Sequence, residues 1–244
     1  MLLKAEQVTK SFGGNRAVRA VDLSLAKGEI LGLIGPNGAG KTTLFNLITG
    51  FYRTDRGSVF FNDKDITHFG PAERCKLGIA RTFQLVRPFQ QMTLGENVAV
   101  GCVYGRTPAK SRREAEARAR EILELVGLAE FFHTPAHTLT LMNRKRLELA
   151  RALATQPCLL LLDEFLAGLN PSEMQTALAL IQRLRASTMT FILVEHIVEA
   201  VFDISDRVMV LNAGEKIAEG RPDQIAADER VINAYLGHGL PAYA

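Results

Sequence analysis

The sequence is poor in cysteine, in net charge and in long apolar runs, and each shortage excludes a class of protein. The three cysteines, Cys75, Cys102 and Cys158, have no ligand spacing, which argues against a disulfide framework or a cysteine metal site. Lys and Arg number 29 against 26 Asp and Glu, and a net charge of +3 gives no argument for a nucleic-acid partner. No stretch reaches the roughly 18 consecutive apolar residues of a membrane helix, and the N-terminus has no signal-peptide core. We therefore expect a soluble cytosolic protein, which could still dock on a membrane protein.

The chain is rich in short apolar segments separated by turn residues. Its 244 residues, 47% of them hydrophobic, suffice for a sizeable core in one large domain or two small ones. Alternation at Leu3, Ala5 and Val8, a turn at 13–15 and renewed alternation up to Leu25 predict a small antiparallel sheet.

From residue 29 onward, predicted strands and helices alternate along the chain. Fully apolar runs predict buried strands over 30–34, 158–162 and 190–194. Helical spacing predicts helices over 110–126, 144–156 and 172–186, followed by a hairpin over 207–219 and a weakly helical tail over 222–236. This alternation predicts an α/β fold with a mostly parallel sheet, whose ligands bind at the carboxyl ends of the strands.

The predicted helix over 110–126 carries many charges of both signs. Glu114 precedes Arg118 by four residues, and Glu116 precedes Arg120 in the same way, so both pairs should form on a solvated face. A basic helix lying on a membrane surface is the competing interpretation, although acids nearly balance bases here.

A glycine-rich loop between a predicted strand and a predicted helix carries the strongest functional signal. The stretch GPNGAGKTT at 35–43 fits the phosphate-binding pattern G-x-x-x-x-G-K-[ST] at every fixed position. Glycines let the backbone curl round an anion, Lys41 can face the β- and γ-phosphates, and Thr42 can ligate Mg²⁺. The helix that follows places its positive end at the phosphate. The expected nucleotide-binding residues are Gly35, Pro36, Asn37, Gly38, Ala39, Gly40, Lys41, Thr42 and Thr43.

An acid pair closes the leucine-rich strand over 158–162. Asp163 stands where phosphate-loop NTPases keep the carboxylate that holds Mg²⁺. Glu164, one residue further, could accept a proton from an attacking water. Two acids in a surface turn are the alternative explanation, which the phosphate loop upstream makes less attractive.

At this point the sequence resembles the ATP-binding subunits of ABC transporters. The residues that carry the resemblance are GPNGAGKTT at 35–43, RTFQ at 81–84, LLLLDE at 159–164, AGLNP at 167–171 and His196. The resemblance extends over about residues 3–236. Within the family the chain is most similar to branched-chain amino acid importer ATPases of the LivG kind. Pointers to that subgroup are FGG at 12–14, MTLGENV at 92–98, RLELARAL at 146–153 and AYLG at 234–237.

The resemblance implies a P-loop NTPase (RecA-like) core with an N-terminal antiparallel β subdomain and an inserted helical subdomain. The β subdomain and the core would occupy 1–83 and 156–220, and the helical subdomain about 84–155. A helical tail would follow over 221–236, and residues 237–244 would fray.

The resemblance also assigns roles to single residues. Phe12 matches the aromatic that stacks on adenine, and Val18 falls among the nucleotide-binding residues. Gln84 matches the residue that touches Mg²⁺ and the water. His196 matches the histidine that contacts the γ-phosphate. By their residue types alone Phe12, Gln84 and His196 would pass for an ordinary strand aromatic, a surface amide and a structural histidine.

One motif departs from the family pattern. The LSGGQ signature, whose hydroxyl and glycine N–H groups grip the opposite subunit's γ-phosphate, falls on Leu139–Asn143. Thr140 keeps a hydroxyl, but Met142 replaces a glycine and precedes Asn143. Either this is a tolerated variant with Met142 turned aside, or the signature is weakened and the two sites of a heterodimer are unequal. The D-loop residues Gly168 and Asn170 would cross to the other subunit, and Phe165 replaces a proline or small residue for no evident reason.

The family implies an ATPase on the cytoplasmic face of the cell membrane. Two copies, or this chain and a related one, would close on two MgATP molecules and drive two transmembrane permease subunits, with a solute-binding protein outside. Leu85, Val86, Pro88 and Phe89 are the candidate permease contacts. Branched-chain amino acids are the expected solute, with urea, other amides and aromatic acids open. A soluble ABC-type ATPase without a permease is the alternative; a GTPase would need a guanine-reading motif, which we do not find.

Overall fold

The computed structural model describes residues 1–83 and 87–236. The chain forms two compact units: the first comprises Met1–Gly70 and Thr190–Ala244, and the second Pro71–Met189. Within the described ranges, no helix is long and apolar enough to cross a membrane. The secondary structure is α/β, as the sequence predicts.

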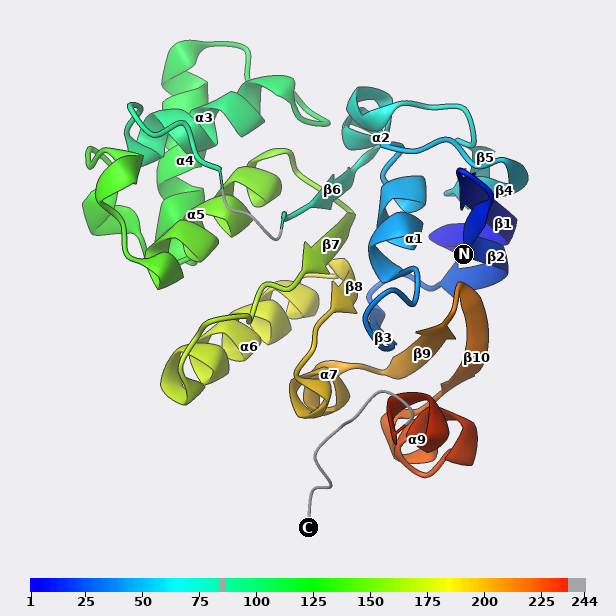
Figure 1. The fold of residues 1–244 in the computed structure, drawn as a ribbon. Coiled ribbons are helices and arrows are strands. Elements are labelled where there is room, and N and C mark those ends of the chain that lie inside the picture. The colour runs from blue at the N-terminus through cyan, green and yellow to red at the C-terminus, as the bar shows by residue number, and fades with distance from the viewer. Residues whose placement is uncertain (84–86, 237–244) are drawn as a thin grey trace. The chain divides into compact units, whose positions relative to one another are not determined.

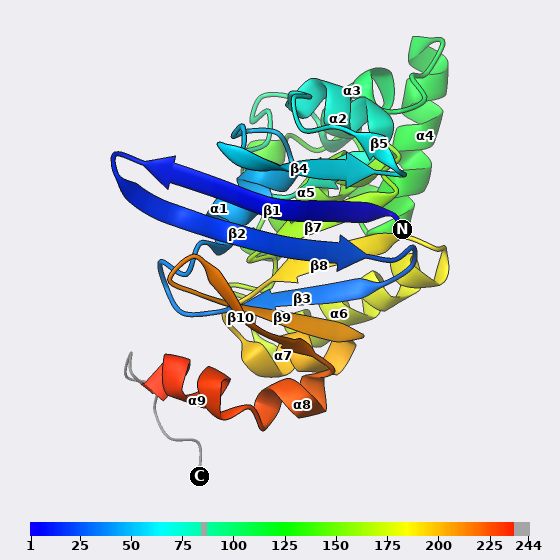
Figure 2. The ribbon, with the colours of Figure 1, turned by 90° about the vertical axis from the view of Figure 1, so that its right-hand side faces the viewer.

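The first unit contains an antiparallel sheet with the order β2-β1-β4-β5. Its strands are β1 (Leu3–Phe12), β2 (Asn15–Leu25), β4 (Arg56–Phe61) and β5 (Lys64–Asp65). Figure 2 shows β1 and β2 as long neighbours joined by the predicted tight turn. Leu3, Ala5 and Val8 are buried, which confirms the alternation read from the sequence. The short strand β5 escapes prediction, because two exposed residues have no apolar periodicity.

The same unit contains strands in the order β10-β9-β3-β8. They are β3 (Ile30–Ile34), β8 (Thr190–Val194), β9 (Arg207–Asn212) and β10 (Glu215–Gly220). Strand β3 pairs in parallel with β8 and β9, whereas β9 and β10 form the predicted antiparallel hairpin. Every residue of β3 and β8 is buried, as expected for parallel strands covered on both faces.

Four helices complete the first unit among the described residues. They are α1 (Lys41–Ile48), α7 (Val198–Ile204), α8 (Pro222–Ala226) and α9 (Glu229–Leu236). The predicted tail helix is thus two helices, separated at Ala227 and Asp228. Helix α7 is absent from the sequence prediction, because seven residues span only about two turns and give a weak periodic signal.

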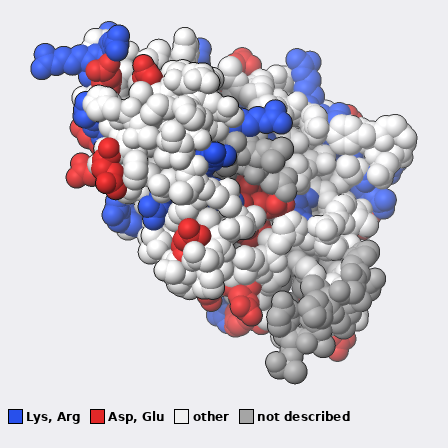
Figure 3. Space-filling model, turned by 60° about the vertical axis from the view of Figure 1, so that its left-hand side comes forward, with Lys and Arg blue, Asp and Glu red and all other residues white. Residues whose placement is uncertain are grey.

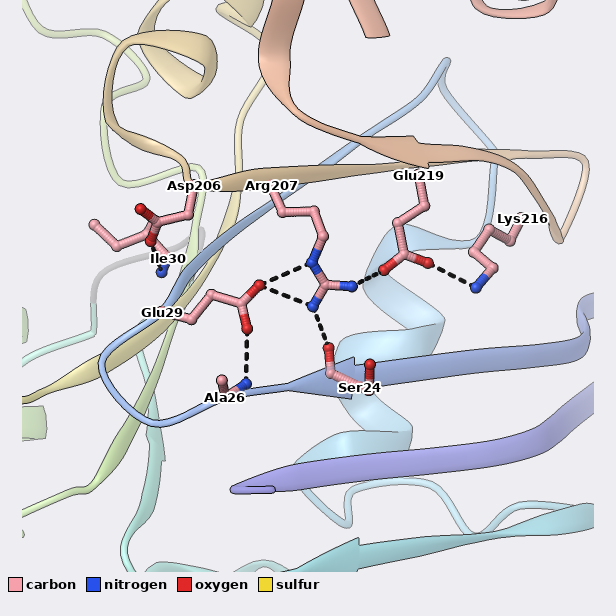
Figure 4. Close-up of polar contacts among 8 residues, drawn as sticks. All are labelled: Ser24, Ala26, Glu29, Ile30, Asp206, Arg207, Lys216 and Glu219. Atoms are coloured by element: carbon pink, nitrogen blue, oxygen red, sulfur yellow. Dashed lines mark hydrogen bonds and ion pairs between the residues drawn. The ribbon is translucent and has the colours of Figure 1, made fainter. Parts of the chain in front are cut away.

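An ion cluster ties the first unit together around Arg207 (Figure 4). Its guanidinium donates to Glu29 Oε1 at 2.8 Å, to the Ser24 carbonyl at 2.6 Å and to Glu219. Glu29 also accepts from the Ala26 N–H, at 2.7 Å. One half-buried arginine therefore links the end of β2, the start of β3 and both strands of the β9–β10 hairpin.

The second unit combines two parallel strands with helices (Figure 1). Its strands are β6 (Ile79–Arg81) and β7 (Leu159–Asp163). Its helices are α2 (Pro71–Leu77), α3 (Leu94–Tyr104), α4 (Arg112–Leu125), α5 (Leu141–Ala154) and α6 (Pro171–Ala186), with 3₁₀ turns η1 (Ala129–Phe131) and η2 (Ala136–Thr138). Helix α5 begins three residues before the predicted start, because the Thr140 side chain caps it.

Helix α3 is the longest element that the sequence prediction lacks. Thr93 and Glu96 cap it reciprocally, which is a start signal that lies within the subgroup motif. Two interior glycines weaken its helical pattern. They serve close packing, since a Cβ on Gly95 would lie 2.5 Å from Phe132, and one on Gly101 would lie 2.7 Å from Ala154 of α5.

The charged helix α4 confirms one predicted ion pair and corrects the other. Arg118 contacts Glu114 as expected. Glu116 instead contacts Arg112, at 2.7 Å. The Arg120 guanidinium lies 3.8 Å from the ring centroid of Phe132, because the face of an aromatic ring attracts a cation. On the face drawn in Figure 3, basic and acidic side chains are scattered among uncharged ones.

Candidate functional site

The phosphate loop follows strand β3 and opens helix α1, as the sequence predicts. Lys41 is buried, and its ammonium donates to the carbonyls of Gly35 at 2.6 Å and Pro36 at 3.0 Å. The Ala39 N–H donates to the Pro36 carbonyl at 3.1 Å. The lysine therefore folds back over the loop that precedes it and holds the loop in its curled form.

Two glycines in this loop stand where no other residue fits. Gly35 has φ +150°, and a Cβ there would lie 2.1 Å from the Leu211 carbonyl oxygen. Gly40 has φ +101°, and a Cβ there would lie 2.4 Å from the Ala17 carbonyl oxygen. The loop is thus a backbone cradle that side chains would fill, at the N-terminus of a helix, which is the arrangement that binds phosphate.

The β9–β10 hairpin supports the loop from its own unit. The Gly214 N–H donates to the Ala39 carbonyl at 3.0 Å, and the Gly214 carbonyl accepts from the backbone N–H of Arg19 at 2.8 Å. Burial raises the pKa of Tyr235 on α9, while a hydrogen bond from the Gly35 N–H opposes that shift. The sequence prediction missed Tyr235, although the residue lies in the subgroup motif at 234–237.

His196 emerges at the same sheet edge as the phosphate loop. Strands β3 and β8 run parallel, with Leu33 opposite Val194. Gly35 and His196 each follow their paired residue by two positions, so the sheet brings the loop and the exposed histidine to one edge. Glu195, between Val194 and His196, is 2% exposed.

Phe12 and Val18 differ sharply in exposure. Phe12 is 43% exposed, and its ring meets the ring of Tyr52 edge-on with centroids 5.1 Å apart. Such a ring can accept a stacked base. Val18 is fully buried within β2, opposite Lys10 of β1. Tyr52 is a second exposed aromatic here that the sequence prediction did not single out.

The acid pair lies in the second unit, at the end of strand β7. Asp163 is buried and forms an ion pair with Arg81 of β6, at 2.9 Å, and both side chains are less than a tenth exposed. Burial lowers the pKa of Arg81, and Asp163 opposes this shift. Arg81 lies in the RTFQ motif but was not predicted to act, since its partner is 82 residues away.

Glu164 occupies an unusual backbone conformation directly after Asp163. Its φ is +50°, in the left-handed region that non-glycine residues avoid, and a turn over residues 165–168 follows.

Gln84 lies outside the described residues. Among the described residues no three His, Cys, Asp or Glu side chains gather into a metal cluster. The predicted magnesium ligands are one hydroxyl, one side-chain amide and one carboxylate, which together need no such cluster.

The altered signature opens helix α5. The Thr140 hydroxyl caps the helix by accepting from the Asn143 N–H at 3.4 Å, which leaves its own O–H to donate. Met142 is 6% exposed and Phe165 is 3% exposed, and both line one cavity with Arg146. Met142 is therefore turned into its own unit, and the two departures from the family pattern line the same cavity.

The D-loop residues Gly168 and Asn170 shape the backbone at the start of helix α6. Gly168 has φ +76°. Asn170 caps helix α6 by accepting from the Glu173 N–H at 2.9 Å, and the Glu173 carboxylate accepts from the Asn170 N–H in return. The helix-capping pattern of Asn-Pro-x-Glu was visible in the sequence.

Comparison with protein families gives two matches. Residues 18–167 match the family described as ABC transporter. Residues 215–240 match the family described as branched-chain amino acid ATP-binding cassette transporter.

Similar proteins span nearly the whole chain. It is 42% identical to the high-affinity branched-chain amino acid transport ATP-binding protein LivG of Escherichia coli K12, covering 97% of this chain and 98% of the relative. It is 41% identical to BraF of Pseudomonas aeruginosa, with the same coverage. Among solved structures, the ADP conformation of the cassette MJ1267 has a TM-score of 0.88 at 35% identity, covering 97% of this chain and 98% of that one. The dimeric cassette MJ0796 bound to ADP and Pi has a TM-score of 0.82 at 26% identity, covering 91% and 99%.

Proposed function

Because this chain belongs to the ABC transporter ATPase family, we propose that it powers an importer of branched-chain amino acids or a related small polar solute. The phosphate loop carries the proposal, since its lysine, glycines and helix are all in place. The names of LivG and BraF, together with the family match over 215–240, support the solute class.

The loop would hold the triphosphate of ATP. Lys41 would exchange its two loop carbonyls for β- and γ-phosphate oxygens, at little cost because the ammonium keeps charge-assisted hydrogen bonds throughout. Thr42, Gln84 and Asp163 would hold Mg²⁺, which supplies positive charge against the phosphate oxygens. Phe12 would stack on adenine, with Val18 beneath as part of the supporting strand.

Hydrolysis needs a general base and a group that binds the γ-phosphate. We assign the base to Glu164, whose carboxylate would accept the proton of the attacking water. We assign γ-phosphate contact to His196, which follows the strand beside the loop strand. Both assignments match the family motifs residue by residue.

The proposed dimer uses the signature of one subunit at the ATP of the other. The N-terminus of α5, where the Thr140 O–H can still donate, is suited to an anion. Gly168 and Asn170 would cross to the partner. The burial of Met142 favours the tolerated variant over the weakened signature. The dimeric MJ0796 cassette supports the assembly.

The remaining assignments concern the membrane. The helical subdomain at about 84–155 would receive the permease's coupling helices on the cytoplasmic face of the membrane. Two permease subunits would belong to the whole assembly, and a solute-binding protein would act from outside. Phe89, 44% exposed, lies in this stretch as one apolar contact.

Affinity purification of the tagged chain from detergent-solubilised membranes tests the proposal. We expect two integral permease subunits and a second ATPase to co-purify, and leucine, isoleucine or valine uptake to fail when the chain is deleted. Recovery of ATPase activity with only soluble partners would instead support the alternative, a soluble ABC-type ATPase without a permease.

A further inference from the structure

A buried lysine on the signature helix reaches the turn that carries the acid pair. Lys145 lies on α5 and is 6% exposed. Its ammonium donates to the Glu164 carbonyl at 3.0 Å and to the Phe165 carbonyl at 2.9 Å. Burying an ammonium is unfavourable unless hydrogen bonds compensate the lost solvation. The two carbonyls provide such bonds, so Lys145 and this turn depend on each other.

The two carbonyls belong to a strained turn. Glu164 has φ +50°, a backbone conformation that is unfavourable for a non-glycine residue and persists only where the surrounding structure enforces it. The Glu164 carbonyl also accepts from the Ala167 N–H, at 3.3 Å. Lys145 thus binds the carbonyl oxygens of two consecutive peptide groups, one before and one after the Phe165 Cα. These bonds restrict rotation of the peptide group that follows Glu164.

The same helix face touches the turn at further points. A Cβ on Gly168 would lie 3.2 Å from the Leu141 side chain, so the end of the turn packs on the first turn of α5. Met142 and Phe165 line a common cavity. The packing at Leu141, the hydrogen bonds of Lys145 and the cavity shared by Met142 and Phe165 place the start of α5 against the turn over 164–168.

A second buried charge lies one helical turn beyond Lys145. Glu148 is 7% exposed, and its carboxylate accepts from the Phe83 N–H. Positions 145 and 148 share a helix face, so the carboxylate, when ionised, is a nearby counter-charge that adds to the two carbonyl acceptors of the ammonium.

We infer that Lys145 is a positioning residue for Glu164: it holds the peptide backbone on which the proposed catalytic carboxylate is carried. This inference rests on the proposed role of Glu164 in ATP hydrolysis. It gives the signature helix a second duty within its own subunit, beside its proposed contact with the partner's ATP. A movement of the helix start would then shift Glu164 through Lys145.

The test compares Lys145→Met with Lys76→Met, a matched removal of an exposed lysine in the same unit. Methionine keeps the length and packing of the stem but donates no hydrogen bond. We expect kcat for ATP hydrolysis to fall at least about tenfold in Lys145→Met, because small displacements of a catalytic group are costly. The KM for MgATP should change less than about twofold, and Lys76→Met should match the wild type. If Lys145→Met does not fold, Lys145→Arg replaces it, and partial activity with unchanged KM is expected.

A double variant separates positioning from general support of the fold. If Lys145 acts through Glu164, then Lys145→Met combined with Glu164→Gln should hydrolyse ATP as slowly as Glu164→Gln alone, in single-turnover measurements. Losses that multiply, or a Lys145→Met enzyme with wild-type kcat, would overturn the inference. Wild-type turnover in Glu164→Gln would overturn the proposed role of Glu164 instead, so the two failures are distinguishable.

Discussion

The phosphate loop and the acid turn solve the same problem, the placement of chemistry after a buried strand, by different means. The loop is held by backbone: its glycines fit against neighbouring carbonyls, and Lys41 bonds to the peptide oxygens of its own loop. The turn is held by buried charged side chains from distant positions, with Arg81 on Asp163 and Lys145 on the peptides of Glu164 and Phe165. A short sequence pattern can therefore encode the first kind of site completely, whereas the second kind depends on contacts that no local pattern contains.

We expect the largest effect from removing the lysine charge of the phosphate loop. Lys41→Ala should lower kcat for ATP hydrolysis by roughly a thousandfold, because one preorganised donor to the phosphate charge is lost. Steady-state phosphate release measures it. The carbonyls of Gly35 and Pro36 lose their buried donor, so nucleotide binding should weaken as well. A kcat within tenfold of the wild type would show that the phosphate loop does not depend on Lys41 for ATP hydrolysis.

Removing the cation from the side-chain-held turn should cost stability. Arg81→Met takes the buried guanidinium away from Asp163, and we expect the free energy of unfolding to fall by about 3 kcal/mol. Urea denaturation measures it. The control is Arg112→Met, which breaks the exposed pair with Glu116 and should leave the free energy of unfolding close to that of the wild type, because solvent screens exposed ion pairs. Equal losses in the two variants would mean that burial does not distinguish the turn.

The next effect concerns pH. Burial raises the pKa of Glu148 to about 7, against the opposing hydrogen bond from Phe83 and the charges of Arg151, Lys145 and Arg81. The folded protein therefore binds this proton more tightly than the unfolded chain, so its contribution to stability is present below about pH 4.5 and is lost as pH rises through about 7.

Relative to Glu148→Gln, the wild type should lose about 2 kcal/mol of unfolding free energy between pH 5 and pH 8. Urea denaturation across that range measures the difference. Parallel pH profiles for the two proteins would show that Glu148 ionises with an ordinary pKa, and that the charge cluster on α5 is more solvated than its burial indicates.

The elements that the sequence predicted well are those with local signals. Strands β3 and β8 have the predicted bounds because each is a continuous apolar run between turn residues. Helix α3 was missed because Gly95 and Gly101, which serve close packing, hide its helical pattern. The pair of Glu116 with Arg120 was wrong because Phe132, outside the helix, attracts the arginine. Arg81, Lys145 and Tyr235 were not recognised, because their partners lie far away in sequence.

In the proposed mechanism, two copies of this fold, or this chain and a related one, close on ATP. The molar mass of the purified Glu164→Gln variant in solution with saturating MgATP, alone and with its companion ATPase, tests this closure. Because this variant should bind ATP without consuming it, we expect a stable dimer that reverts to monomers when ATP is replaced by ADP. A strictly monomeric mass in both mixtures would rule out the proposed closure.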